Sequence, residues 1–147
     1  MRQLNLSNQK LINEVATIHE KLLESQEANY KATSTSIALR IEMINARLRH
    51  CQDMILIIED NQELQALIWG HFEKQTKVVT IELLFVYPKC RRQGFARQLK
   101  LALEDWAMKE GAQTIQSTIN TKNQAMLNLN HQIGYEDTHI KMKKDLK

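Results

Sequence analysis

The sequence predicts one α+β domain over residues 1–147, built on a mostly antiparallel, twisted sheet of about six to seven strands flanked by about four helices. Three observations predict this class. The chain has 147 residues, the size of one domain. Apolar residues recur at helical spacing in two early segments, and three short apolar stretches separated by polar turns follow them. The predicted order is β-α-α-β-β-β-α-β-α-β.

The first 50 residues are predicted to form a short strand, 2–6, and two helices. Ser7 is suited to cap the first helix, whose apolar face would consist of Leu11, Ile12, Val15, Ile18, Leu22 and Leu23. After a polar stretch, three hydroxyl residues offer a second cap: Thr33, Ser34 and Ser36. The helical spacing then returns up to His50 at Ile37, Ile41, Ile44 and Leu48.

Residues 54–87 are predicted to form an antiparallel meander. Three apolar stretches, 54–58, 64–72 and 78–87, are joined by short polar segments typical of turns, the first of them 59–62. Pro88 ends the third strand because proline has no N–H to donate to a neighbouring strand.

Helical spacing resumes after Gly94 and continues to Gly111, a residue typical of helix C-caps. Trp106 of this helix, like Trp69 of the preceding meander, is interpreted as a core residue. The remainder is predicted to form a strand, a short helix and a last strand, over residues 114–119, 124–133 and 134–142.

Composition excludes several classes of protein. Hydrophobic residues make up 43% and charged residues 25%, which is typical of globular domains and excludes disordered and coiled-coil chains. No apolar run approaches the ~20 residues of a membrane span, and residues 1–20 lack a signal-peptide pattern, so we expect a cytoplasmic protein without a membrane partner. Two cysteines and five scattered histidines indicate no metal site.

A basic turn precedes the predicted helix that follows Gly94. Between positions 89 and 100 the chain has no acidic residue and five basic ones: Lys89, Arg91, Arg92, Arg97 and Lys100. A helix N-terminus with unpaired N–H groups beside arginines is suited to bind a pyrophosphate, and Gly94 and the small Ala96 allow close approach. Two alternatives remain: an ordinary helix start with surface arginines, or a nucleic-acid-binding stripe. The lack of interleaved aromatic residues counts against nucleic acid.

Two motifs here resemble the GNAT superfamily of acetyl-CoA-dependent N-acetyltransferases. Arg91-Arg92-Gln93-Gly94-Phe95-Ala96 after Val86-Tyr87-Pro88 is similar to the family signature Arg/Gln-x-x-Gly-x-Gly/Ala after a strand ending Val-x-Pro. Asn123, a short helix and Gly134-Tyr135 are similar to its second block. The resemblance covers residues 78–146 by motif and residues 1–77 by element order. It implies acetyl-CoA as cosubstrate, a small-molecule or peptide or protein amine as acceptor, and a homodimer.

The resemblance also implies a cofactor site. In the family, the backbone of the fourth strand pairs with the pantetheine arm and the turn before the next helix holds the pyrophosphate. The cofactor-binding residues expected from this resemblance are Leu84, Phe85, Val86, Arg91, Arg92, Gln93, Gly94, Phe95, Ala96, Asn123 and Asn130.

Glu82 is the expected general base, because it is the single charge in the apolar stretch 80–86 and the family often places a base there. With regular alternation it would share the face of Leu84 and Val86, whereas a β-bulge would change that face. The alternative is a carboxylate that points to solvent. The family commonly has a tyrosine as general acid seven residues after Asn123, where this chain has Asn130. An amide cannot give up a proton, so Asn130 is expected to bind the cofactor sulfur or a water.

Four other residues are weaker candidates for acid or nucleophilic chemistry. Tyr87 and Tyr135 are alternative acids or packing residues, His131 an alternative acid or a surface residue, and Cys90 an activated thiol or a small loop residue. Four acidic residues of the first two helices supply charge for a cationic amine or form a solvated face: Glu20, Glu24, Glu27 and Glu42. Asn130 also leaves open a non-catalytic acyl-CoA-binding protein.

Overall fold

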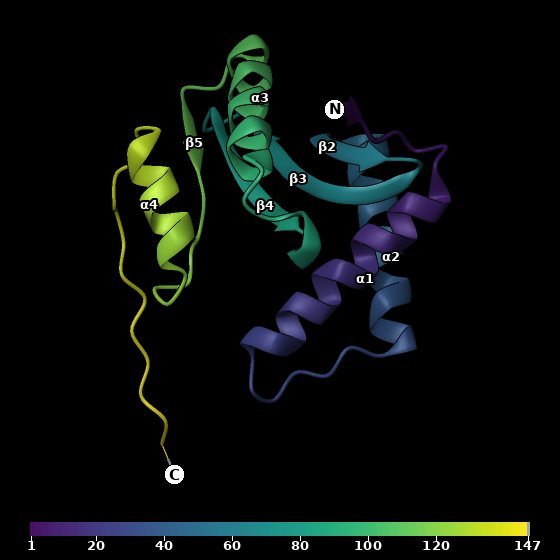
Figure 1. Cartoon of the computed structure of the whole chain (residues 1–147), viewed down its shortest axis with the longest axis horizontal. Helices are drawn as coiled ribbons and strands as arrows, with labels where there is room; N and C mark the ends of the chain where they lie inside the picture. Colours follow the sequence, from purple (N-terminus) through teal and green to yellow (C-terminus); the bar gives the residue numbers. More distant parts are fainter. Residues whose placement is uncertain (147) are drawn as a thin grey trace. The chain divides into compact units, whose positions relative to one another are not determined.

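The computed structural model describes residues 1–146 in two parts, the first ending at Ser117 and the second beginning at Thr118. Figure 1 shows the elements of both parts in chain order. The first part contains β1 (Arg2–Gln3), α1 (Gln9–Gln26), α2 (Ser34–His50), β2 (Gln52–Asp60), β3 (Glu63–Glu73), β4 (Val78–Val86), the 3₁₀ turn η1 (Pro88–Cys90), α3 (Phe95–Glu110) and β5 (Thr114–Gln116). The second part contains α4 (Gln124–Gln132).

One sheet organises the first part, with the strand order β1-β2-β3-β4-β5. Neighbours from β1 to β4 are antiparallel, and β5 pairs parallel with β4. The predicted α+β class and mostly antiparallel sheet are therefore confirmed. The described residues form a five-stranded sheet, fewer strands than the six to seven expected.

The missing strand is the last one predicted. Residues 134–142 contain no strand, and two apolar side chains within this segment, Ile140 and Met142, are 83% and 87% exposed. A strand is stable only when its backbone pairs with a neighbour and one face is buried. Residues 134–142 meet neither condition. The preceding strand is also shorter than expected, since β5 ends at Gln116.

The meander has a tighter first turn than the sequence indicated. β2 extends to Asp60 and β3 begins at Glu63, so only Asn61 and Gln62 lie between them. Both have positive φ, 51° and 65°, as a type I′ hairpin turn requires. The register shifts by one residue between Glu59 and Ile58, where Gln65 is the extra residue of β3, and this shift places Asp53 opposite His71.

The first two helices begin at side-chain caps. Asn8, and not Ser7, caps α1, because its side chain accepts a hydrogen bond from the Leu11 N–H at 3.2 Å. Thr33 caps α2 in a capping box with Ser36. In the described part of the chain, no helix is both long enough and apolar enough to cross a membrane.

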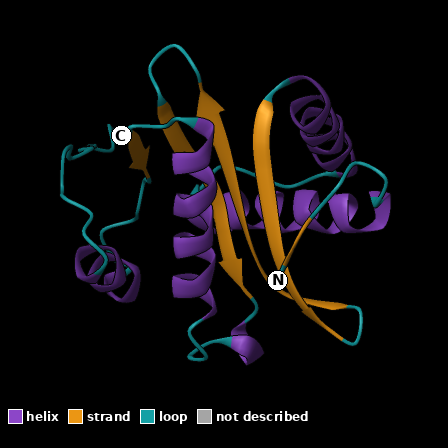
Figure 2. Cartoon of the chain, turned by 90° about the horizontal axis from the view of Figure 1, so that it is seen from above, coloured by secondary structure: helices purple, strands orange, loops and turns teal. Residues whose placement is uncertain are grey.

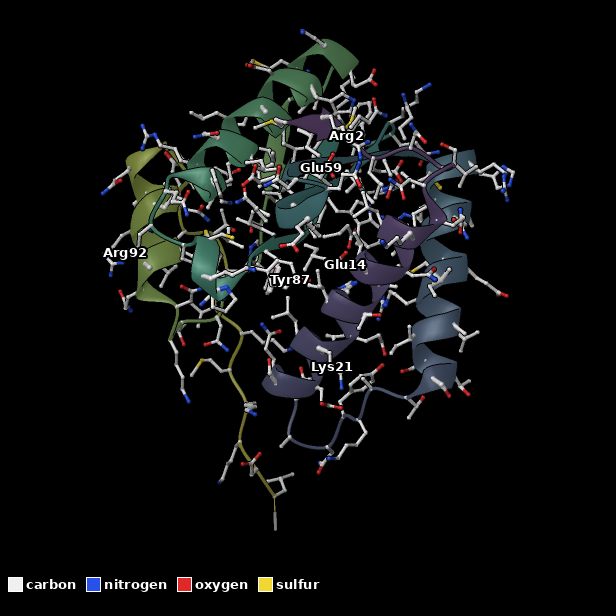
Figure 3. All side chains as sticks on the ribbon, turned by 45° about the vertical axis from the view of Figure 1, so that its right-hand side comes forward. Arg2, Glu14, Lys21, Glu59, Tyr87 and Arg92 are labelled. Carbon is white, nitrogen blue, oxygen red and sulfur yellow. The ribbon has the colours of Figure 1, made fainter. Side chains whose placement is uncertain are left out.

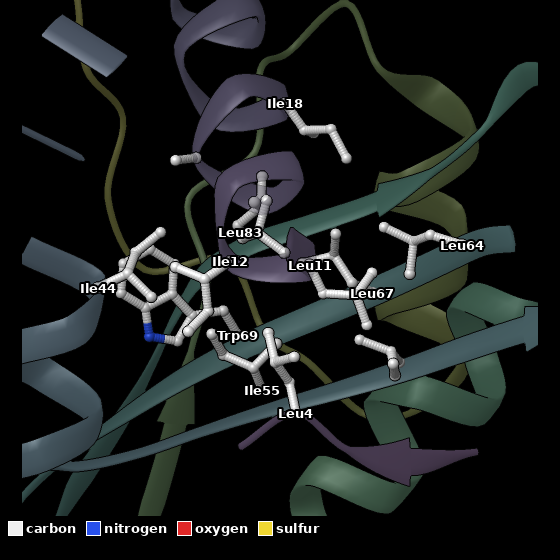
Figure 4. Packing of buried hydrophobic residues seen from close by; sticks show 13 residues of the cluster. Leu4, Leu11, Ile12, Ile18, Ile44, Ile55, Leu64, Leu67, Trp69 and Leu83 are labelled. Carbon is white, nitrogen blue, oxygen red and sulfur yellow. The ribbon is translucent and has the colours of Figure 1, made fainter. Parts of the chain in front are cut away.

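Helices cover both faces of the sheet, as Figure 2 shows for α3 on one side and α1 and α2 on the other. The first core cluster joins α1, α2 and one sheet face, around the fully buried Trp69 (Figure 4). The second core cluster joins α3 to the opposite face through Leu99 and Leu103. Trp69 is thus confirmed as a core residue, and Trp106 packs against the second cluster.

Gly70 allows α3 to approach β3 closely. A Cβ added at this position would lie 2.9 Å from both Cδ atoms of Leu103. Contacts this short do not occur between real side chains, so glycine is needed for the close packing of helix on strand.

Candidate active site

A β-bulge in β4 decides where Glu82 points. Leu83 pairs with Trp69 and Ile81 with Gly70, which leaves Glu82 as the extra residue of β4. Its carboxylate lies 2.9 Å from Nη2 of Arg47 on α2. The alternation in β4 is therefore not regular, and of the two possibilities that the sequence left open the bulge is the one found, so Glu82 does not share the face of Leu84 and Val86.

The two sides of β4 carry different side chains as a result. Leu83 and Phe85 belong to the first core cluster, toward α1 and α2. Leu84 and Val86 pack in the second cluster, toward α3. Because Glu82 contacts α2, its carboxylate lies on the side of the sheet that α1 and α2 cover. It is also 30% exposed, so it remains accessible to a ligand.

The buried carboxylate of Asp53 holds Arg47, the partner of Glu82, in position. Nε of Arg47 donates to Asp53 at 3.0 Å, and the Asp53 side chain is completely buried. Asp53 also accepts from Nε1 of Trp69 at 2.6 Å and lies 2.6 Å from Nδ1 of His71. The guanidinium of Arg47 lies 5.4 Å from the centre of the Trp69 ring. Glu82 is therefore held by an arginine that is itself fixed on two sides.

Sequence reasoning missed this network. Arg47 was one basic residue among several on a predicted helix, and Asp53 lay outside the predicted strand 54–58. The two-residue turn at 61–62 alone would place Asp53 opposite Gly70; the extra residue Gln65 shifts the register by one, so that Asp53 pairs with His71. Recognising the hairpin turn would therefore not have predicted this polar pair without knowledge of the register shift as well.

His19 of α1 lies next to this network. Its ring packs edge-on against Trp69 at 5.8 Å, and its Nδ1 is buried with no hydrogen-bond partner among residues 1–146. Burial and the positive charge of Arg40 lower the pKa of His19 to about 4, against opposing effects of Glu20 and Glu82. The imidazole is therefore neutral at pH 7.

The end of β4 is paired on one edge only. Its parallel pairing with β5 covers three residues and stops at Thr80, whereas its pairing with β3 continues to Val86. Within residues 1–117, Leu84, Phe85 and Val86 thus have no strand on the β5 side. An extended ligand with amide groups can pair with such a free edge.

The basic turn has the backbone conformation of an anion site. Arg92 and Gly94 have positive φ, 63° and 80°, and α3 begins directly after them. No side chain caps α3, and the N–H groups of residues 92–94 donate to no acceptor within residues 1–146. A Cβ added at Gly94 would meet no atom within 4 Å, so the glycine is required by its φ and not by crowding. Consecutive N–H groups in this conformation bind phosphate oxygens.

The charges around this turn are fewer than the sequence suggested. The side chains of Arg91, Arg92 and Arg97 are exposed, and Nε of Arg91 donates to the Val86 carbonyl at 3.0 Å. Lys100, counted in the basic stripe, is completely buried, and burial lowers its pKa to about 8. A buried lysine cannot contact a phosphate backbone, which weakens the nucleic-acid alternative.

The second part of the chain carries the two asparagines of the expected site. Asn123 caps α4, since its side chain accepts from the Met126 N–H at 3.2 Å. Asn130 is 6% exposed, and its Oδ1 has no hydrogen-bond partner among the described residues. Its backbone carbonyl accepts from the Tyr135 N–H at 2.9 Å. His131 is exposed and lies 2.7 Å from Asp137.

Tyr87 is engaged as a packing residue. Its hydroxyl donates to Oε2 of Glu14 on α1 at 2.7 Å, and its ring meets Phe85 edge-on at 4.9 Å. Figure 3 shows Tyr87 and Glu14 close together, with Lys21 farther along α1. Burial, together with the bond to Glu14, raises the pKa of Tyr87 above its usual value, so its phenol is a poor proton donor. Cys90 is buried within η1.

The acidic residues of α1 are used within the fold. Glu20 is 1% exposed and accepts from Arg40 at 2.8 Å and from Tyr30. Burial acts to raise the pKa of Glu20, but hydrogen bonds from Ser36, Tyr30 and Arg40 lower it to about 2. Glu24 accepts from the Ala32 N–H at 2.8 Å. Both therefore anchor the connection from α1 to α2. Within residues 1–146, no cluster of three or more His, Cys, Asp or Glu residues could hold a metal ion.

The comparisons with known proteins agree with this geometry. The model of the Acetyltransferase (GNAT) family matches residues 16–135. A crystal structure from Staphylococcus aureus subsp. aureus, assigned to the GNAT acetyltransferase family, is 50% identical and has a TM-score of 0.76. The match covers 80% of this chain and 98% of that one. Among curated proteins, none matches this chain by sequence.

More distant structures share the fold. AAC(6')-Iy, in complex with a bisubstrate analog of CoA and acetylneamine, is 18% identical with a TM-score of 0.67, over 99% of this chain and 96% of that one. An aminoglycoside acetyltransferase from an uncultured soil metagenomic sample, in complex with sisomicin, is 12% identical with a TM-score of 0.73, over 99% and 95%.

Proposed function

The chain belongs to the GNAT acetyltransferase family, and from this premise we propose that it transfers the acetyl group of acetyl-CoA to a primary amine, by direct attack in a ternary complex. The proposal depends on two features that occur together in this structure: an accessible carboxylate at Glu82 that is held in place, and a helix start at Gly94 that no side chain caps. The first is suited to deprotonate an amine. The second is suited to bind a pyrophosphate.

The residues around β4 and α3 fit acetyl-CoA. The N–H groups of Arg92, Gln93 and Gly94 would hold the pyrophosphate, with the α3 N-terminus and the nearby arginine side chains adding positive charge. The remaining predicted contacts of the turn are Arg91, Phe95 and Ala96. The free edge of Leu84, Phe85 and Val86 would pair with the pantetheine amides. When bound, acetyl-CoA supplies an acetyl group activated as a thioester.

Glu82 performs the acid–base step of the proposed reaction. An alkyl amine with a pKa of about 10.4 is neutral in roughly one molecule per 2,500 at pH 7. Glu82 takes the proton of the ammonium, directly or through water, so that the nitrogen can attack. The C–N bond forms, the C–S bond breaks and the CoA sulfur leaves as thiolate. The second proton lost by the nitrogen passes through water to this thiolate, and Glu82 returns its own proton to solvent. Arg47 keeps the carboxylate in one orientation throughout.

Asn130 and Asn123 are proposed to act on the cofactor side. The unpartnered Oδ1 of Asn130 supports a polar role for that side chain, as a hydrogen-bond partner of the cofactor sulfur or of a water. No proton can come from the amide, and a thiol with a pKa of about 8.5 leaves tolerably as thiolate. Asn123 orders the start of α4. The single domain over 1–147, the cytoplasmic location and the homodimer remain predictions.

The first test is thermal denaturation with acetyl-CoA, CoA and ATP at two salt concentrations. A ligand that binds only the folded state at 100 times its Kd adds about 2.7 kcal/mol. We expect acetyl-CoA and CoA, but not ATP, to raise the Tm by several degrees. If acetyl-CoA, CoA and ATP raised the Tm equally and high salt abolished the rise, the turn would be a basic patch without specificity for CoA.

Activity then separates an enzyme from a binding protein. Thiol release with an amine panel should occur, and Glu82→Gln should lower kcat/KM by about 10²-fold or more while acetyl-CoA still raises the Tm. Glu110→Gln, at the exposed end of α3, is the matched control and should change nothing. Asn130 in place of a tyrosine favours one other function, non-catalytic acyl-CoA binding. Stabilisation by acetyl-CoA without turnover of any amine would support it.

A further inference from the structure

A groove of about 390 Å³ runs between the second half of α1 and the end of β4. Its walls are apolar, formed by Ile18, Leu22, Phe85 and the ring of Tyr87. Two hydroxyl residues of α1 complete the lining together with Lys21, the only charged residue among those that line it. This volume lies in the range of small-molecule sites, which are about 300–1,000 Å³.

The groove opens on the same side of β4 as the proposed base. Phe85 faces the first core cluster with α1, and the bulge turns Glu82 toward the same side. They are three positions apart along the strand, which spans about 10 Å at ~3.3 Å per residue. A molecule seated on Phe85 can therefore present an amine to Glu82.

No carboxylate lines the groove, although α1 carries three of them close in sequence to the lining residues. Glu14 accepts the Tyr87 hydroxyl, and Glu20 is buried against Arg40. Glu24 accepts the Ala32 N–H and lies 3.8 Å from Lys21. Lys21 is therefore the charged side chain that a second cation on the acceptor would meet within the groove.

We infer that this groove selects acceptors whose single primary amine is carried on an apolar body of leucine or phenylalanine size, and that it discriminates against polycations. The inference rests on the proposed function, because it assigns the acceptor of the same reaction. Apolar surface on the acceptor is removed from water against four apolar side chains, whereas a polyamine or aminoglycoside would bring uncompensated charge there. Charge repulsion by Lys21 adds to this discrimination.

The substrate test compares 2-phenylethylamine, isoamylamine, ethanolamine and spermidine at saturating acetyl-CoA, with thiol release as the readout. We expect KM for 2-phenylethylamine and isoamylamine to be at least tenfold below KM for ethanolamine and spermidine. An equal or lower KM for ethanolamine or spermidine would overturn the inference and leave the acetyltransferase activity itself intact.

Two variants assign the effect to the groove. Leu22→Asn should raise KM for 2-phenylethylamine about tenfold and leave KM for ethanolamine and acetyl-CoA unchanged. Its control is Leu39→Asn, because Leu39 is a 62% exposed leucine on α2. Lys21→Glu should lower KM for spermidine several-fold, and Lys10→Glu, an exposed lysine of the same helix, should not. Lys21→Glu also keeps the test decisive if Leu22→Asn fails to fold.

Other occupants of the groove give different results. A rise in KM for acetyl-CoA in Leu22→Asn would place the cofactor there, and a changed oligomeric state of that variant in light scattering would place a second copy there. Either result overturns the inference.

A binding measurement does not depend on turnover. In methyl NMR of the CoA complex, 2-phenylethylamine should shift the Ile18 and Leu22 signals and leave Ile115, which packs in the second cluster, unchanged. Unshifted Ile18 and Leu22 signals contradict the inference. Failure of CoA itself to bind contradicts the proposed function instead.

Discussion

Nη2 of Arg47 and Oε1 of Glu82 lie 2.9 Å apart, although 35 positions separate the two residues in the sequence. The pair forms because the bulge in β4 turns Glu82 toward α2, where Asp53 holds the guanidinium at 3.0 Å. A single buried carboxylate thus sets the position of an arginine, and that arginine sets the position of the proposed base.

Replacing Arg47 should impair catalysis through Glu82. Arg47→Gln removes the ion pair that orients the carboxylate, so we expect kcat/KM to fall about tenfold, less than the loss in Glu82→Gln. The matched control is Arg49→Gln, because Arg49 is exposed on the same helix and should be silent. Steady-state kinetics with a saturating amine measures both.

A double mutant distinguishes positioning from a general structural effect. In the Glu82→Gln background, Arg47→Gln should cost little further activity, because the residue that Arg47 orients is already inactive. Equal fold-losses in the two backgrounds would show that Arg47 acts independently of Glu82.

Asp53 should be among the costliest positions for stability. Asp53→Ala leaves Arg47 without its buried counter-charge and Trp69 Nε1 without an acceptor, which predicts a loss of about 3–5 kcal/mol in the free energy of unfolding. Urea denaturation measures this loss. Asp105→Ala, on the exposed face of α3, should change stability by less than about 0.5 kcal/mol. A similar small change for Asp53→Ala would contradict the prediction.

His19 predicts a pH dependence of stability. Because its pKa is about 4 in the folded chain and about 6.5 when unfolded, the unfolded state binds more protons between these values. The free energy of unfolding therefore rises with pH through this window. The contribution of His19 to stability is fully present above about pH 6.5 and is lost as the pH falls toward 4. Denaturant titrations at several pH values test the slope.

In the variant His19→Phe, the free energy of unfolding should change by roughly 2 kcal/mol less across this pH window. Phenylalanine keeps an aromatic ring against Trp69 but has no titrating group. His139→Phe, at an exposed histidine, serves as the control. An unchanged slope in His19→Phe would show that other groups carry the dependence.

Gly70 should tolerate a side chain only if Leu103 is shortened. Gly70→Ala places a Cβ 2.9 Å from the Leu103 side chain, which predicts a loss of about 1–3 kcal/mol. In a Leu103→Ala background the clash is absent, so the same substitution should cost much less. Strictly additive losses in urea denaturation would show that the contact is not the cause.

Much of the element order follows from local sequence. The predictions from local sequence included the helical spacing in α1, α2 and α3, a cap of α2 among Thr33, Ser34 and Ser36, the end of β4 before Pro88 and the C-cap at Gly111. Each depends on residues a few positions apart. The last strand was wrongly predicted for a related reason. A strand needs a partner strand, which local sequence does not supply, and residues 134–142 form no ladder.

By itself, then, the sequence determined the α+β class, the basic turn with its required Gly94 and the choice of Glu82 as the charged residue of β4. Only the tertiary structure decided the face on which Glu82 lies, its partner Arg47, the burial of Lys100 and the apolar groove beside Phe85. These features depend on a strand register that a single extra residue shifts, and on contacts between residues far apart in the chain. Local propensity carries no information about either.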